Sequence, residues 1–166
     1  MIEFTLGEPI PEGAPTLRRL AVRAVVWRGE RLLLVRTNKG DYKFPGGGQE
    51  TGEDDAQTLV RETLEETGYL VRPAGALFCR AIERRRDLYD ESQYFYMTSL
   101  YYPCELCAPE SAGQRLSGYE VALEMAPVFV EPREAIAYNE RLMQSGVGVL
   151  RWVERETRVL RALCAE

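Results

Sequence analysis

One predicted helix constrains this 166-residue chain more than any other feature. It follows a run of three consecutive glycines and ends at another glycine. Gly46–Gly48 give the backbone unusual conformational freedom. Three acidic residues follow at the start of the helix, where the helix dipole favours negative charge. The pattern predicts a helix over 53–67, capped by Thr51 or Gly52 and ended by Gly68.

The predicted helix has two chemically different faces. At about 100° per residue, Glu66 lies near +40° from Glu62 and Glu65 near −60°, so three carboxylates share about one turn. Like charges at this spacing repel each other, and a divalent cation would offset the repulsion. Carboxylate oxygens are the ligands that Mg²⁺ and Mn²⁺ prefer. The alternative interpretation is an ordinary solvated helix face. The opposite face would pack on a sheet and carries Ala56, Val60, Thr63, Leu64 and Thr67.

Composition excludes several kinds of chemistry. The chain has no histidine, which excludes a Ser-His-Asp triad, a Cys-His dyad, an HExxH metalloprotease and any zinc site that needs imidazole. Its formal charge of −5 argues against binding nucleic acid through phosphates. That charge is concentrated, because residues 47–69 hold seven acidic side chains and one arginine, and the rest of the chain is close to neutral.

Apolar runs predict strands on both sides of this helix, and the first two form a hairpin around Gly29. The expected strands cover 20–27, 31–35, about 70–82, 93–103 and 127–130. Pro132 suits the first position of a helix that runs to about 143, and a last helix is expected over about 150–163. Residues 1–17 are expected to form an irregular arm or edge segment, and 103–120 a loop.

The length suits a single domain over 1–166. The first residues have neither a basic start nor an apolar stretch, so we expect no signal peptide. We also expect no membrane span, since no run of about eighteen apolar residues occurs. Without a secretory signal, the four cysteines are expected to be reduced thiols and the protein cytoplasmic.

The spacing of the fixed residues around the helix forms a longer motif. Gly47 is followed after five residues by Glu53, after seven more by Arg61-Glu62, and then by Glu65-Glu66 and Gly68. This pattern resembles the Nudix box, GX5EX7REUXEEXGU, and the preceding Phe-Pro-Gly-Gly-Gly is also similar to that family. The chain departs at the bulky aliphatic positions, which hold Thr63 and Tyr69.

The resemblance implies roles for individual residues. Glu62, Glu65 and Glu66 match the metal-binding glutamates, and Arg61 matches the arginine that pairs with Glu53. The carbonyl of Gly46 or Gly47 is expected to be a further metal ligand. Family members often add a distant glutamate as ligand or general base, for which Glu120 is the first candidate and Glu124 the second. Glu50 is a weaker candidate beside the glycines.

The resemblance also implies a fold and a reaction. We expect an α/β (α+β) fold, the Nudix α/β/α sandwich, with a mixed β-sheet between helices. We expect Mg²⁺- or Mn²⁺-dependent hydrolysis of a phosphoanhydride bond in a nucleoside diphosphate linked to another group. That substrate class covers a nucleoside triphosphate, ADP-ribose or a nucleotide sugar, and no residue decides among them. The alternative is a Nudix-like nucleotide-binding or regulatory domain without catalysis. A homodimer is compatible with the family, although the sequence marks no interface.

Three other segments are less informative. Cys104 and Cys107 form a CxxC that is expected in a loop rather than at a helix start, so a redox or metal role is the weaker interpretation. Arg84–Arg86 are read as a solvated charge run, with contact to substrate phosphates as the alternative. The aromatic strand around 94–102 is read as core, and the alternative is stacking on a nucleobase.

Overall fold

A nine-stranded mixed sheet organises the chain, and the computed structural model describes residues 1–165. Its main strand order is β1-β7-β8-β2-β3-β4, with β5 beside β2, β6 beside β8 and β9 beside β3. The pairs β1/β7 and β2/β8 are parallel and the others antiparallel. The strands are β1 (Ile2–Leu6), β2 (Thr16–Arg28), β3 (Arg31–Arg36), β4 (Tyr42–Lys43), β5 (Gly46–Gly48), β6 (Val71–Pro73), β7 (Cys79–Arg86), β8 (Tyr94–Leu106) and β9 (Ala126–Val130).

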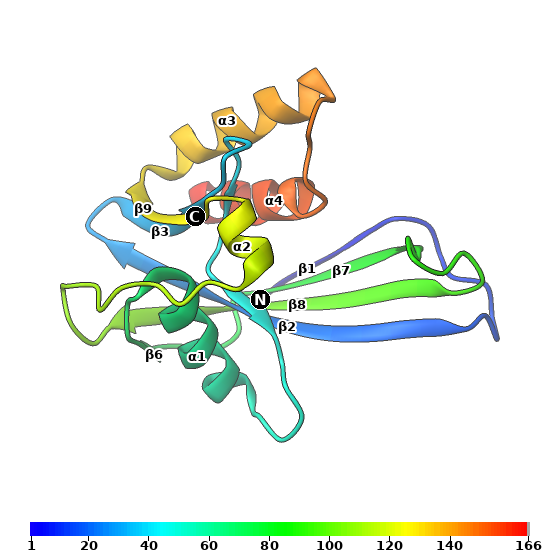
Figure 1. Cartoon of the computed structure of the whole chain (residues 1–166), viewed down its shortest axis with the longest axis horizontal. Coiled ribbons are helices and arrows are strands. Elements are labelled where there is room, and N and C mark those ends of the chain that lie inside the picture. Colours follow the sequence, from blue (N-terminus) through cyan, green and yellow to red (C-terminus); the bar gives the residue numbers. More distant parts are fainter. Residues whose placement is uncertain (166) are drawn as a thin grey trace.

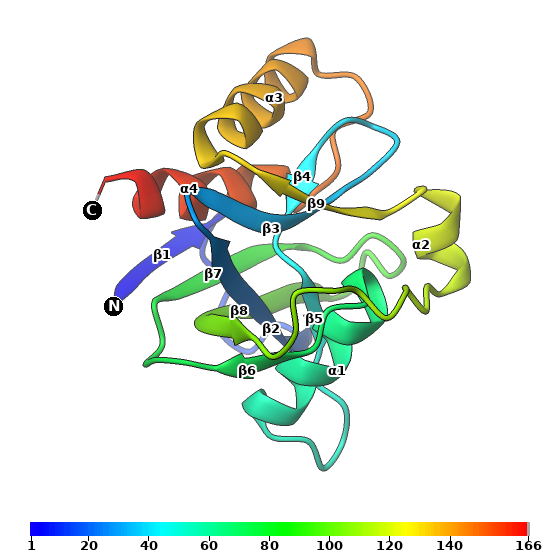
Figure 2. The ribbon, with the colours of Figure 1, turned by 90° about the vertical axis from the view of Figure 1, so that its left-hand side faces the viewer.

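Helices cover both faces of this sheet (Figures 1 and 2). They are α1 (Asp55–Thr67), α2 (Gly118–Ala122), α3 (Pro132–Ser145) and α4 (Val153–Cys164). Because neighbouring side chains of a strand point to opposite faces, β2 supplies two cores. Val22 and Val26 pack in a cluster with Leu59 of α1, whereas Val25 packs in another with Leu160 of α4. The mixed sheet between helices confirms the predicted fold class.

Several predicted elements are confirmed with shifted bounds. The hairpin around Gly29 is present as β2 and β3, and β9 and α3 lie where they were predicted. Residues 1–17 do form an edge segment, since β1 adds to the sheet beside β7. Strand β2 begins at Thr16, earlier than predicted, because its first residues pair with the aromatic strand β8. No helix among residues 1–165 is long and apolar enough to cross a lipid bilayer.

The predicted cap of the box helix is wrong. Asp54 caps α1, because its side chain accepts a hydrogen bond from Gln57 N, and Gln57 accepts one from Asp54 N. This capping box satisfies backbone donors at the helix start better than Thr51 or Gly52 could. Glu53 is therefore outside the helix.

The strand predicted at about 70–82 is interrupted, and β8 is longer than predicted. Both β6 and β7 pair with β8, but Pro73 lies opposite Cys104 and Cys79 opposite Tyr101. The segment 74–78 is longer than the stretch of β8 opposite it, so these residues form a loop. The predicted loop at 103–120 begins only after Leu106 and ends in α2, and the last helix begins at Val153 rather than at 150.

A buried carboxylate joins the last helix to the sheet. Glu156 of α4 is fully buried, and its Oε1 accepts hydrogen bonds from Arg155 Nη2 at 2.7 Å and Tyr101 OH at 3.0 Å. Its Oε2 accepts from Phe44 N at 2.9 Å, and Arg23 Nε of β2 lies 3.5 Å from Oε1. Burial opposes ionisation, but the charges of Arg155 and Arg23 outweigh it and hold the Glu156 pKa below its ordinary value.

Replacing Glu156 with Gln should lower the free energy of unfolding by about 3 kcal/mol, because buried Arg23 loses its counter-charge and buried Arg155 loses one of its two. Since the Glu156 pKa is lowered in the folded state, the deficit should be complete above about pH 5. It should shrink only as the pH falls through the folded-state pKa and wild-type Glu156 is itself protonated. Urea denaturation of both proteins across this pH range measures the deficit.

Glu154→Gln is the matched control, because Glu154 lies on the same helix but is exposed and pairs with the exposed Arg158. It should change the free energy of unfolding by less than about 0.5 kcal/mol. Equal losses in the two variants would contradict the role assigned to Glu156.

Candidate active site

Two glycines bring the strand β5 against its neighbours more closely than any side chain would allow. Gly46 has a φ of +137°, and a Cβ there would lie 2.1 Å from Val22 O. A Cβ on Gly47 would lie 2.2 Å from Glu62 Oε2. The absence of side chains therefore lets the carboxylate of α1 approach the backbone of β5.

Arg61 ties the segment before α1 to the helix itself. Its Nε and Nη2 donate to the two carboxylate oxygens of Glu53, at 2.6 and 2.8 Å, and Nη2 also donates to Gly48 O at 3.1 Å. This is the bidentate contact that the Nudix resemblance implies. The hydrogen bonds from Arg61 contribute most to lowering the Glu53 pKa, to about 2.

The three glutamates of α1 have different surroundings. Glu66 is buried, and its Oε2 accepts a hydrogen bond from Gly46 N at 3.0 Å. Glu62 is largely buried and accepts from Arg61 Nη1 at 2.7 Å, whereas the Glu65 side chain is 42% exposed. Burial is the main cause that raises the Glu62 pKa, with smaller contributions from the charges of Glu66 and Glu65.

Lys43 is a residue of this site that the sequence analysis missed. It lies in β4, is buried, and forms an ion pair with Glu66 Oε1. A lysine is rarely buried without a partner. The sequence offers only a weak signal for it, a lone cation between two aromatic residues just before the glycine run.

The donor set beside β5 fits a hard divalent cation in its chemistry. Glu62 and Glu66 present carboxylate oxygens next to the backbone of Gly46 and Gly47, and such oxygens suit Mg²⁺ or Mn²⁺. The Gly46 carbonyl also accepts a hydrogen bond from Arg23 Nη1 at 3.0 Å. Within residues 1–165, however, no three acidic or cysteine side chains converge closely enough to form a ready cation site. Lys43 and Arg61 supply the positive charge among the carboxylates.

The distant candidates have local partners. Glu120 lies in α2, and its Oε2 accepts a hydrogen bond from Ser117 N at 2.6 Å, which closes the start of that helix. Glu124 is exposed, and its φ of +49° puts its backbone in the left-handed region. Glu50 is also exposed and lies 4.0 Å from Arg61. Among the described residues, no hydrogen bond or ion pair links any of these three to Glu62 or Glu66.

The CxxC does not form a reactive pair. Cys104 is buried within β8 and Cys107 is exposed beyond its end, and both are free thiols. Burial raises the Cys104 pKa to about 12, whereas a redox-active thiol needs a lowered pKa.

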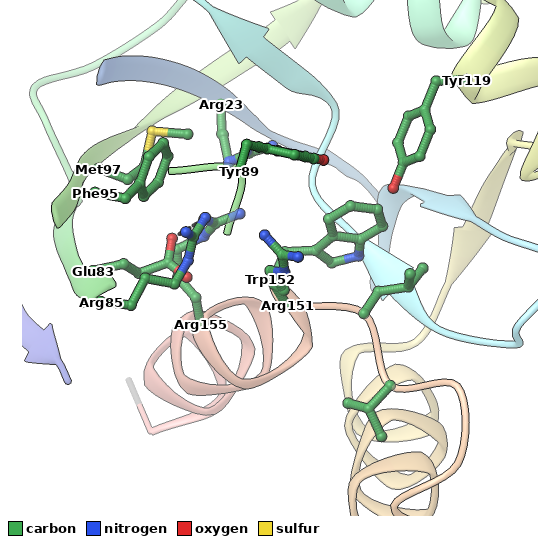
Figure 3. Close-up of a pocket in the computed structure, with 12 residues that line it drawn as sticks. Arg23, Glu83, Arg85, Tyr89, Phe95, Met97, Tyr119, Arg151, Trp152 and Arg155 are labelled. Atoms are coloured by element: carbon green, nitrogen blue, oxygen red, sulfur yellow. Dashed lines mark hydrogen bonds and ion pairs between the residues drawn. The ribbon is translucent and has the colours of Figure 1, made fainter. Parts of the chain in front are cut away.

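A cleft of about 450 Å³ lies between the sheet and the start of α4 (Figure 3). Its walls come from β2, β7, β8, the start of α4 and α2, and they combine arginines with aromatic side chains. Arg23 lines the cleft and donates a hydrogen bond to Gly46 O. Trp152 also lines the cleft, and its ring centroid lies 5.8 Å from Lys43 Nζ. Two residues of the cleft, Arg23 and Trp152, thus contact Gly46 and Lys43, which are the partners of Glu66.

Of the arginine run, only Arg85 lines the cleft. Arg84 and Arg86 lie over the rings of Tyr96 and Tyr94, on the other face of β7 and β8. Phe95 is the aromatic residue of β8 that lines the cleft. Because side chains alternate between the two faces of a strand, these three consecutive arginines lie in different surroundings.

Comparison with known proteins agrees with this geometry. The sequence matches the NUDIX domain model over residues 17–153, and no curated protein matches it significantly. A NUDIX hydrolase from Nitrosomonas europaea aligns with a TM-score of 0.60 at 18% identity, over 88% of this chain and 90% of its own. An ADP-ribose pyrophosphatase from Streptococcus suis aligns with a TM-score of 0.50 at 20% identity, over 69% and 75%. A UDP-X diphosphatase has the same TM-score and identity, over 84% and 69%.

These structural similarities lie below 25% identity and support the fold. The family match covers most of the chain and includes the whole segment from Gly46 to Gly68 that carries the carboxylates. The chain belongs to the Nudix hydrolase family.

Proposed function

We propose that this protein is a metal-dependent pyrophosphohydrolase, which cleaves a phosphoanhydride bond in a nucleoside diphosphate linked to a second group. The observation that carries the proposal is the position of Glu66. One of its oxygens is bound to Gly46 N and the other to Lys43, and it lies one turn from Glu62 on α1. Arg23, which lines a nucleotide-sized cavity, donates a hydrogen bond to the carbonyl of the same Gly46, and this contact links the carboxylates to the cavity.

Glu62 and Glu66 would hold the cation, with Glu65 and a carbonyl of Gly46 or Gly47 as further candidate ligands. A bound Mg²⁺ or Mn²⁺ would offset the diphosphate charge and make a coordinated water more acidic. Arg61 holds Glu62 and Glu53 in place, and Lys43 forms an ion pair with Glu66 beside them.

The chain has no histidine, and a carboxylate is the proposed acceptor of the proton of the attacking water. As the water oxygen bonds to phosphorus, the anhydride oxygen leaves with the electron pair of its bond. Glu120 stays the candidate for a base or ligand from outside the box. To act so, it must release Ser117 N, to which it is now bonded.

Substrate choice is part of the proposal. Two structurally similar proteins carry the names ADP-ribose pyrophosphatase and UDP-X diphosphatase, and both names describe a nucleoside diphosphate joined to another group. That class fits a cleft with both arginines and aromatic rings. A cytoplasmic location, the absence of nucleic-acid binding and a homodimer stay predictions.

Glu62→Gln and Glu66→Gln should each lower kcat by about a hundredfold or more, because each substitution removes a charged oxygen from the reacting centre. Circular dichroism and thermal unfolding show whether each variant is folded. Glu105→Gln is the control, since Glu105 is exposed and pairs with Arg72 on the sheet. Undiminished hydrolysis in both active-site variants would contradict their assigned roles.

The requirement for a cation is tested by measuring phosphate release from a panel of nucleotides, with a coupled phosphatase. Hydrolysis should depend on added Mg²⁺ or Mn²⁺ and should stop when a chelator is present. Binding of nucleotides without hydrolysis of any of them would favour the alternative, a Nudix-like binding domain.

A further inference from the structure

We propose that Arg85 and Arg151 form an anion subsite, which selects nucleotides that carry a phosphate monoester separate from the scissile diphosphate. The choice of substrate rests on the proposed function, whereas the subsite itself rests on the cleft and its charges. Figure 3 shows the two side chains entering the cleft from different elements, Arg85 from β7 and Arg151 from the turn before α4.

The cleft has two more positive charges than its acidic neighbours balance. Four arginines line it, but two of them are compensated. Arg155 forms ion pairs with Glu83 and Glu156, and Arg23 lies beside Glu156. Neither Arg85 nor Arg151 forms an ion pair with any residue in the part of the chain that the structure describes. An anionic ligand would supply the missing charge.

The two carboxylates whose charges act on Arg85 each have one oxygen bound to another partner. Glu83 is paired with Arg155, and Asp87 Oδ1 accepts hydrogen bonds from Tyr89 N and Asp90 N at 2.9 and 3.1 Å. Asp87 is buried in this turn and shapes the loop between β7 and β8. Neither acid forms an ion pair with Arg85 among residues 1–165.

Arg85 is held ready for a ligand. Its guanidinium lies over the ring of Phe95, 3.9 Å from the centroid, which fixes the plane of the group. Burial and the nearby charge of Arg151 lower the Arg85 pKa, and Glu83 and Asp87 oppose this only in part. The two guanidinium groups therefore repel each other beside the partly buried Arg85, and an anion between them would relieve the repulsion.

A phosphate monoester matches this arrangement best. Its three terminal oxygens can accept hydrogen bonds from two guanidinium groups at once, and its charge near −2 balances both. A carboxylate has one charge and two oxygens, so it can satisfy only one arginine fully.

The subsite is separate from the place where the diphosphate would be cleaved. In the sheet order β7-β8-β2-β5, Arg85 lies three strands away from the glycine run of β5. At the usual strand spacing this is about 14 Å. A group bound by Arg85 and Arg151 is therefore another part of the nucleotide. Arg23 and Trp152 line the same cleft and contact Gly46 and Lys43, on the side of the carboxylates.

The test compares paired probes that differ in one anionic group. ADP-ribose and 2′-phospho-ADP-ribose test a phosphate monoester, and UDP-glucose and UDP-glucuronate test a carboxylate. Isothermal titration calorimetry with the Glu62→Gln variant measures binding, and kcat/KM of the wild type measures turnover. We expect the phosphorylated probe to be preferred by about tenfold to a hundredfold, the usual effect of charge-assisted hydrogen bonds. In Arg85→Gln and Arg151→Gln the ratio should fall toward one.

Arg84→Gln is the matched control, because Arg84 is adjacent to Arg85 on β7 but lies over Tyr96 on the opposite face. It should leave both binding and the ratio unchanged. Equal binding of the paired probes by the Glu62→Gln protein, or an equal loss of preference in Arg84→Gln, would overturn the subsite. A preference for the carboxylate probe alone would overturn the phosphate assignment. Selective binding without any hydrolysis would instead contradict the proposed function and leave the subsite standing.

Discussion

The site depends on the contacts of one buried carboxylate, that of Glu156. It holds Phe44 N just before the glycine run, Tyr101 in the sheet and Arg155 on its own helix, and it neighbours Arg23. A buried charge with this many partners tolerates few arrangements, because each unpaired group would keep its full desolvation cost. Helix α4, the central strands and the segment that leads to β5 are thereby fixed relative to one another.

Much of the fold follows from local patterns in the sequence. The hairpin around Gly29, the start of α3 at Pro132 and the end of α1 at Gly68 depend on residues adjacent in the chain. The errors have both non-local and local causes. The break between β6 and β7 follows from their register on β8, which no local pattern encodes. The prediction that Thr51 or Gly52 caps α1 was wrong because Asp54 and Gln57 form a capping box at the helix start.

The same division applies to the site. The contact between Arg61 and Glu53, and the grouping of Glu62 with Glu66, follow from a single segment whose spacing is visible in sequence. Lys43, Arg23 and Trp152 come from separate elements and become neighbours only through the tertiary fold. Their residue types, a lysine, an arginine and a tryptophan in otherwise ordinary strands and turns, gave no sign of a shared role.

Arg23 contacts both the glycine run and α4, so ligand binding in the cleft is coupled to the carboxy-terminal helix. One side of its guanidinium contacts the backbone of the glycine run, and its Nε lies beside Glu156 on α4. A nucleotide that stabilises Arg23 in this position would also stabilise the packing of α4 on the sheet. Slower amide exchange in α4 would then be a remote signature of an occupied cleft, measurable without following any chemistry. Residues far from the phosphates could in this way modulate affinity through the rigidity of the fold.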